Sequence, residues 1–352
     1  MADELENLLG ALSVSGGEPF ILQANFWEHE GGGDIPGQCA PLLNRNAGLL
    51  KTDAAANSAL LARSAKWAEL CGADKVTELP KVSPVAGAGT TQSIIWRDAE
   101  RTFMSEPCRQ QMIDTLEKVA DGDYHQGMGY LTGFLLLVVP TRDVANILHR
   151  VGTDAKYTPG YWKGQPEAFV RDAMVYQELI RTRLPEACKH LETANLVPEA
   201  YAQKWFVGLC VHAMPFASLM DVMEGFLAEG SLFLFKLSVA IVAAIQPRIL
   251  ECKPHEVNKL FELLRLDRKL FPDEDLSFFA AILESAKKVE VTEEEIATLR
   301  EEQWTLLQAK LAKVRAREQE LKDEDDGSDG IEFSDESDEE DEAERLAKLA
   351  AQ

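Results

Sequence analysis

The chain has 352 residues, of which 46% are hydrophobic, and this is enough apolar material for one or two well-packed domains. Its net charge of -23 at pH 7 argues against DNA, RNA or anionic lipid headgroups as binding partners, because such sites draw on clusters of lysine and arginine. The six cysteines are scattered without a CxxC pair, so we expect reduced thiols and no disulfide framework.

Both ends of the chain differ in composition from its middle. Residues 1–52 are rich in glycine and turn-forming residues, which predicts a flexible arm. The first twenty residues are acidic where a secretory signal is basic, so export is not expected. Residues 323–352 begin with a run that holds fourteen acidic residues and no lysine or arginine. We predict that this tail is disordered, because its charges repel one another.

Residues 53–290 have the apolar periodicity of helices and no sustained alternation with a period of two. Asp53 predicts the start of an alanine-rich helix, and Gly72 predicts its end. The strongest helical patterns that follow cover residues 109–120, 129–139, 171–184, 198–214, 219–230 and 232–245. Because two of these carry few polar residues, the others must enclose them. We therefore predict an all-α, irregular multi-helix domain.

The longest apolar stretch of the chain is Leu232–Ile245. Lys236 interrupts it, and it is shorter than the roughly 20 residues that cross a bilayer. We therefore expect a core helix and no membrane span.

A last amphipathic helix is predicted within residues 291–322. Its apolar residues follow a 3,4 spacing, at Trp304, Leu307, Leu311, Val314 and Leu321. The run covers about two and a half heptads, fewer than the three to four that identify a coiled coil. Pairing with another helix through residues 292–321 and packing on the chain's own domain are equally consistent with this pattern.

The sequence does not support any of three common kinds of cofactor or metal site. Gly127, Gly129 and Gly133 have the wrong spacing for a dinucleotide site, so close helix packing explains them better. The chain contains no GxxxxGK[ST] motif for holding nucleotide phosphates. A structural zinc needs four ligands, whereas cysteine and histidine occur together only in isolated pairs. We expect no cofactor and no metal bound by this chain itself.

Two short segments carry the residues of chemical interest. Ile95, Asp98 and Arg101 share a helical face, and Asp98 can hold the guanidinium of Arg101 at the i, i+3 distance. Tyr124 and Gln126 follow in a turn that opens an apolar helix. Spacing alone favours an exposed ion pair, worth less than about 1 kcal/mol, and an ordinary polar turn.

Taken together, the two segments resemble the TBC family of Rab GTPase-activating proteins, whose signatures IxxDxxR and YxQ occur in this order. The segment YHQGMGYLTGFLLLV is also similar to the family pattern, and the resemblance covers roughly residues 60–265. The chain departs from the pattern at Asp123, His125, Gly129, Asp221 and the pair Met223–Glu224. At His125 cysteine is usual, and at Met223–Glu224 a Trp-Asp pair is usual.

The resemblance implies a GTPase activator for a Rab-type small GTPase, with the partner carrying GTP and magnesium. Arg101 and Gln126 would be the catalytic residues, both supplied in trans. Asp98 would orient Arg101, Tyr124 would fix the turn, and Ile95 would anchor the helix in the core. The resemblance also implies a cytoplasmic protein that visits endomembranes transiently through its GTPase partner.

Two other functions remain compatible with the sequence. One is a TBC-like scaffold that binds a GTPase or a trafficking partner without stimulating hydrolysis. The other assigns function to the last helix and the acidic tail, as a tether or an autoinhibitory segment. Geometry distinguishes the activator from the scaffold, because an activator needs Arg101 and Gln126 exposed side by side.

Overall fold

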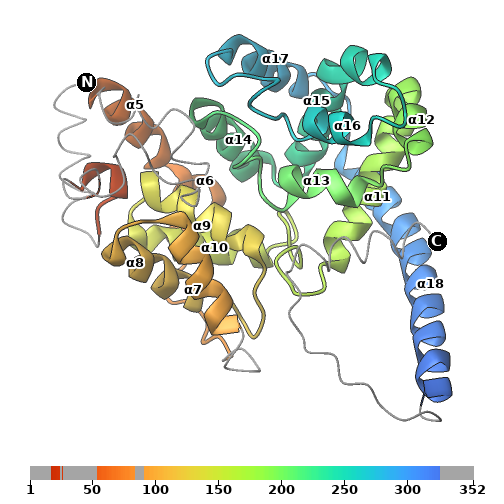
Figure 1. Ribbon diagram of the computed structural model, residues 1–352. Coiled ribbons are helices and arrows are strands. Elements are labelled where there is room, and N and C mark those ends of the chain that lie inside the picture. Colours follow the sequence, from red (N-terminus) through yellow and green to blue (C-terminus); the bar gives the residue numbers. More distant parts are fainter. Residues whose placement is uncertain (1–16, 24–25, 27–53, 84–90, 326–352) are drawn as a thin grey trace.

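A computed structural model describes residues 17–23, 26, 54–83 and 91–325 of the chain (Figure 1). Every element in these ranges is a helix, which confirms the all-α prediction. In chain order the elements are η1 Phe20–Leu22, α5 Ala54–Ser64, α6 Trp67–Cys71, η2 Ala73–Lys75, α7 Thr91–Thr102, α8 Glu106–Glu117, α9 Gln126–Val138, α10 Thr141–Thr153, α11 Glu167–Arg183, α12 Pro185–Thr193, α13 Pro198–Phe206, α14 Phe216–Glu229, α15 Ser231–Glu251, α16 Val257–Leu264, α17 Leu276–Ala286 and α18 Glu293–Asp325.

The predicted arm and tail lie largely outside the described residues. A short piece of the arm is described, and it packs on the residue that follows α7. The ring of Phe20 lies 5.2 Å from that of Phe103, and the ring of Phe26 lies 6.5 Å from it. All three rings are buried, so this piece is part of the core. At the other end, helix α18 continues to Asp325, past the predicted helix boundary at residue 322.

The helices form two groups, with α5–α10 on one side of the molecule and α11–α18 on the other (Figure 1). Each group encloses one strongly apolar helix. Helix α9 contacts α7, α8 and α10, and helix α15 contacts α11, α12 and α17. Helix α14 contacts both α6 and α15 and so joins the two groups. This arrangement explains why α9 and α15 have few polar residues.

Helix α15 is longer than the predicted apolar stretch. It begins at Ser231, contains Pro247 and ends at Glu251. Within the described residues it is the one helix long and apolar enough to cross a membrane, judged by length and composition alone. In this fold 61% of its apolar window is buried inside the molecule. Packing against its neighbours therefore accounts for its composition.

Two predicted helices have different ends in the structure. The first predicted helix is divided into α5 and α6, and Ser64 at the end of α5 donates a 2.6 Å hydrogen bond to the carbonyl of Val138. Gly72 ends α6 as predicted, with a φ of 74°. Its predicted start, Asp53, lies outside the described residues.

The second difference concerns α13, which was predicted to continue to residue 214 and ends at Phe206. The backbone N–H of Gly208 turns back to the carbonyl of Gln203, at 3.0 Å. The next two residues are left-handed, with φ values of 44° at Leu209 and 60° at Cys210. This conformation is costly for residues other than glycine, and it persists only where the surroundings hold it.

Helix α18 is tied to its own domain through the buried carboxylate of Asp172 in α11. This carboxylate accepts hydrogen bonds from the hydroxyl of Tyr161 at 2.6 Å and from Arg171 at 2.7 Å. Arg300 of α18 donates two further bonds, at 3.0 and 2.5 Å, and another to Ser231 at 3.1 Å. The pKa of Tyr161 lies well above its ordinary value, because of burial first and the neighbouring Asp172 second. Packing on its own domain is thus observed for this helix.

The packed side of α18 agrees with the predicted one at Leu307, Leu311 and Val314 and differs from it at Trp304, while the side chain of Leu321 lies outside the described residues. Ile296, Gln303 and Leu307 are buried, and Leu311 and Val314 are partly buried. Trp304, which was assigned to the same side, is 40% exposed. The buried residues of α18 lie on the same side of the helix as Arg300. Its bonds to Asp172 fix the rotation of α18 about its axis.

We expect Asp172→Ala to lower the free energy of unfolding by about 3–5 kcal/mol, because it leaves Arg300 buried without its counter-charge. Urea denaturation measures the effect. Glu178→Gln on the same helix is the matched control, since the exposed Arg181–Glu178 pair is worth less than about 1 kcal/mol. Equal effects of the two substitutions would contradict this assignment.

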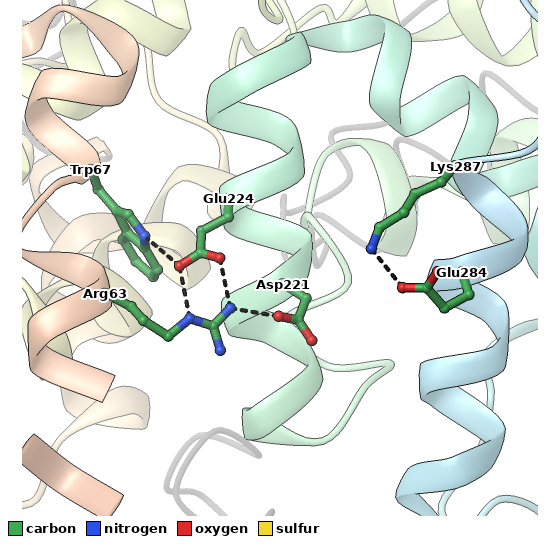
Figure 2. Close-up of polar contacts among 6 residues, drawn as sticks. All are labelled: Arg63, Trp67, Asp221, Glu224, Glu284 and Lys287. Atoms are coloured by element: carbon green, nitrogen blue, oxygen red, sulfur yellow. Dashed lines mark hydrogen bonds and ion pairs between the residues drawn. The ribbon is translucent and has the colours of Figure 1, made fainter. Parts of the chain in front are cut away.

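A second set of ion pairs joins α5 to α14, at the place where the chain departs from the family pattern. Arg63 donates to Glu224 at 2.8 and 2.7 Å and to Asp221 at 2.5 Å, and Trp67 donates to the same Glu224 carboxylate at 3.4 Å (Figure 2). Met223, between the two acidic residues, is buried. The residues that depart from the family pattern therefore help to pack α14, Asp221 and Glu224 by pairing with Arg63 and Met223 by its burial.

The Arg63–Glu224 pair predicts an acid-sensitive contribution to stability. Burial alone raises the pKa of Glu224, but the hydrogen bond and charge of Arg63 outweigh it and lower this pKa below the ordinary 4.5. The contribution is therefore complete above pH 4.5 and is lost as the pH falls through the lowered pKa. We expect the unfolding free energies of wild type and Arg63→Met to differ at neutral pH and to converge on acidification. A difference that does not shrink as the pH falls below 4.5 would exclude this role.

Candidate functional site

Helix α7 presents one side to the core and the other to solvent. Ile95 is buried, as expected for an anchor, whereas its neighbours Trp96 and Arg97 are exposed. Asp98 faces inward and is only 3% exposed, although it is an acidic residue. A buried carboxylate is costly without partners, so the contacts of Asp98 determine what surrounds it.

The turn before α9 is built from polar contacts to the backbone. Asp123 accepts hydrogen bonds from the backbone N–H groups of Tyr124, at 2.9 Å, and of Gly164, at 2.7 Å. His125 is the N-cap of α9, and its Nδ1 accepts from the backbone N–H of Gly127 at 3.0 Å. Gln126 is the first residue of the helix. The turn residues that differ from the family pattern are therefore the ones that shape the turn.

The carboxylate of Asp98 joins the two segments. Its Oδ2 accepts a 2.6 Å hydrogen bond from the hydroxyl of Tyr124. Its Oδ1 accepts from Nη2 of Arg101 and, at 3.4 Å, from Nε2 of Gln126. Arg101 and Gln126 thus contact the same oxygen atom, although 25 positions separate them in the chain. The structure brings four of the five predicted site residues together, and Ile95 lies behind them in the core.

The Asp98–Arg101 pair has the predicted spacing but differs from the exposed ion pair that spacing alone favoured. The Arg101 side chain is 56% exposed, whereas that of Asp98 is 4% exposed. Spacing within α7 could not indicate this, because the burial of Asp98 depends on Tyr124, which lies on a different segment. Partial burial lowers the pKa of Arg101, but Asp98 more than compensates and raises it overall. The guanidinium therefore remains charged at any physiological pH.

Two glycines allow this close arrangement. A Cβ atom on Gly127 would lie 2.4 Å from Cγ1 of Val207, and one on Gly129 would lie 2.4 Å from the hydroxyl of Tyr124. Both distances are too short for non-bonded atoms, so close packing is confirmed as the reason for these glycines. Val207 follows α13, and sequence reasoning did not associate it with the site. Its neighbour Gly208 was the only local signal of a turn there.

The chemical abilities of the site follow from its side chains. A permanently charged guanidinium and an amide lie next to each other at the surface, held by a buried carboxylate. Such a pair can donate hydrogen bonds to an anion, and the amide can also accept one. Within the part of the chain that the structure describes, no cluster of three or more His, Cys, Asp or Glu side chains is arranged to hold a metal ion.

The part of the chain that contains the site is similar to a known protein family. Residues 86–250 match the family model described as the Rab-GTPase-TBC domain, a shorter range than residues 60–265. The chain is 27% identical to Carabin of Mus musculus over 206 residues, which are 53% of this chain and 45% of Carabin. It is 25% identical to growth hormone-regulated TBC protein 1-A of Danio rerio over 170 residues, which are 44% of this chain and 47% of that protein. The chain thus spans less than half the length of each.

A solved structure has a similar fold. It is the crystal structure of the Chlamydomonas flagellar RabGAP TBC domain, with a TM-score of 0.50. The likeness covers 73% of this chain and 91% of that one, at 16% sequence identity. At this identity the likeness concerns the fold alone.

We expect Tyr124→Phe to lower the free energy of unfolding by about 1.5–3 kcal/mol, because a buried carboxylate loses a donor. Tyr157→Phe is the matched control, since its hydroxyl donates to the neutral carbonyl of Leu227 at 2.8 Å, and a bond of that type is worth about 1 kcal/mol. Urea denaturation compares the two variants. A cost for Tyr124→Phe no greater than that of the control would argue against a charged Asp98.

Proposed function

Because this chain belongs to the TBC-domain family, we propose that it accelerates GTP hydrolysis on a Rab-type small GTPase by supplying Arg101 and Gln126 in trans. The supporting observation is their shared contact with Oδ1 of Asp98, which keeps a cation and an amide side by side at the surface. In this proposal the GTPase carries the GTP and the magnesium ion, and the present chain completes the site around the phosphate.

Arg101 would neutralise the charge that develops on the transferred phosphoryl group. A guanidinium supplied in trans is worth about 10³ to 10⁵ in rate for this chemistry. Its exposed side chain leaves room for a second anion, because the bond to Asp98 uses one terminal nitrogen and a guanidinium has five N–H donors. Asp98 would hold the side chain in position without consuming its whole donor set.

Gln126 would orient the attacking water. A primary amide suits this role, because its oxygen accepts a hydrogen bond from the water while its nitrogen donates to a phosphate oxygen. The 3.4 Å contact with Asp98 is long for a hydrogen bond, so little energy is lost when the amide turns toward a ligand. Its place at the first residue of α9 also puts the positive end of the helix dipole near the phosphate.

The second candidate function is a scaffold that grips a GTPase or a trafficking partner without stimulating it. The observation that favours it is the ion pair itself, because Asp98 already neutralises Arg101 in the isolated chain. An activator must therefore direct the remaining donors of Arg101 to the phosphate within the complex. Rates and affinities measured on the same variants separate the two functions.

We also propose roles for the parts of the chain and a location in the cell. Residues 53–290 would form the GTPase-activating domain, with residues 291–322 docked on it as a further helix. The protein would act in the cytoplasm and reach endomembranes through its GTPase partner.

We expect Arg101→Ala to reduce single-turnover GTP hydrolysis by at least about 10²-fold, or about 3 kcal/mol, with the fold intact. Arg101→Lys should fail to restore the rate, because an ammonium offers only a point charge. A panel of purified Rab-type GTPases, assayed by phosphate release, identifies the substrate and measures the loss.

The controls for this experiment come from the same helices. Arg97→Ala removes an equal charge from the exposed side of α7 and should leave the rate within a few-fold of wild type. Gln126→Ala should lower the rate while the variant still binds the GTPase. An undiminished rate for Arg101→Ala would exclude the arginine finger, and binding without stimulation by wild type would establish the scaffold.

A further inference from the structure

The cap of helix α9 is unusual in its chemistry. Helix N-caps are mostly Ser, Thr, Asp or Asn, whose oxygen atoms accept a backbone N–H and do not gain a proton near neutral pH. Here the acceptor is Nδ1 of a histidine, His125, 3.0 Å from the backbone nitrogen of Gly127. The ring stands directly before Gln126, and the chain has it where the family pattern has cysteine.

The hydrogen bond fixes the protonation state of the ring. A nitrogen that accepts from an N–H group carries no proton, so the neutral ring has its proton on Nε2. That nitrogen lies 3.5 Å from Nε2 of Gln203 in α13, and because both nitrogens then carry protons, Gln203 accepts from the ring only when its amide is turned to present its oxygen. Both ring nitrogens are thus directed at neighbouring groups, and the ring is held between α9 and α13.

We propose that His125 is a positioning residue for Gln126, which it holds in place only while the imidazole is neutral. The neutral ring closes the first turn of α9, where Gln126 begins the helix beside Asp98. Protonation of the ring breaks this closure and releases the amide. The effect on hydrolysis rests on the proposed function, whereas the effect on the helix end does not.

Two physical effects act in the same direction when the ring gains a proton. Nδ1 becomes a donor and then faces the N–H group of Gly127, which is also a donor, so their hydrogen bond is lost. The added positive charge also lies at the positive end of the helix dipole. Without the cap the backbone at Gln126 is held less firmly, and the 3.4 Å contact of its amide with Asp98, which is long for a hydrogen bond, positions the side chain less well.

The groups around His125 determine the pH at which this happens. Burial lowers the pKa of the ring, and it outweighs the raising effect of Asp98 on α7 and Asp123 in the preceding turn. Helix α13 contributes Gln203, which does not titrate. The pKa is therefore below the ordinary 6.5. The cap is intact at neutral pH, and its contribution is lost as the pH falls through this lowered value.

The first test is the pH profile of single-turnover hydrolysis with the full chain and its GTPase partner. Wild-type activity should fall as the pH drops through the pKa of the ring and level off near the rate of His125→Ala. His125→Asn keeps a side-chain acceptor that does not titrate, so it should retain the neutral-pH rate and lose this dependence. His125→Ala should be slow at every pH. Dividing the wild-type rate by the His125→Asn rate at each pH removes the pH dependence that belongs to the GTPase itself.

The second test needs no GTPase. In the full chain labelled with ¹⁵N at glycine and ¹³C at histidine, the amide signal of Gly127 should move with the titration of His125. In His125→Asn the amide should not titrate. An amide signal that ignores the ring overturns the proposal, and so does a His125→Ala variant with the wild-type rate and profile. If Arg101→Ala leaves hydrolysis unchanged, the proposed function fails, while the Gly127 signal still decides the role of His125.

Discussion

The carboxylate of Asp98 is the constraint on which the candidate site depends. A carboxylate that is 3% exposed is tolerated only if its oxygens are paired, and no single neighbour in α7 pairs both of them. The hydroxyl of Tyr124 therefore approaches one oxygen, and the side chains of Arg101 and Gln126 approach the other. The need to satisfy one buried charge thus places a cation from one helix beside an amide from another.

The surroundings of Asp98 are shaped to permit this arrangement. Gly127 and Gly129 leave room for Val207 and for the Tyr124 hydroxyl, which larger residues would displace. Asp123 holds the turn before α9 through two backbone N–H groups. Val207, which lies against the start of α9, is the C-cap of α13, and the left-handed residues Leu209 and Cys210 follow it.

Buried or partly buried carboxylates also join the other elements of the fold. Asp172 fixes the rotation of α18 against α11, and Glu224 connects α14 to α5 through Arg63. At the second of these the chain departs from the family pattern, and the structure shows an ion pair and a buried Met223 in place of the usual residues. The departure lies on helices other than α7 and α9, so packing has changed there while the Asp98 cluster is complete.

The sequence by itself determined the helical class and the position of most helices, because apolar periodicity records which side of each helix is buried. It also indicated Asp98, Arg101, Tyr124 and Gln126, through the order of two short motifs. Only the tertiary structure decided that Asp98 is buried, that α13 ends at Phe206, that Trp304 faces solvent, and that His125 caps α9. The burial of Asp98 depends on Tyr124 and Gln126, which lie on another segment of the chain, whereas the end of α13 and the cap of α9 each depend on a hydrogen bond to one particular backbone or side-chain group. Local periodicity cannot record such pairings, because the partner that satisfies a buried polar group is chosen by the fold.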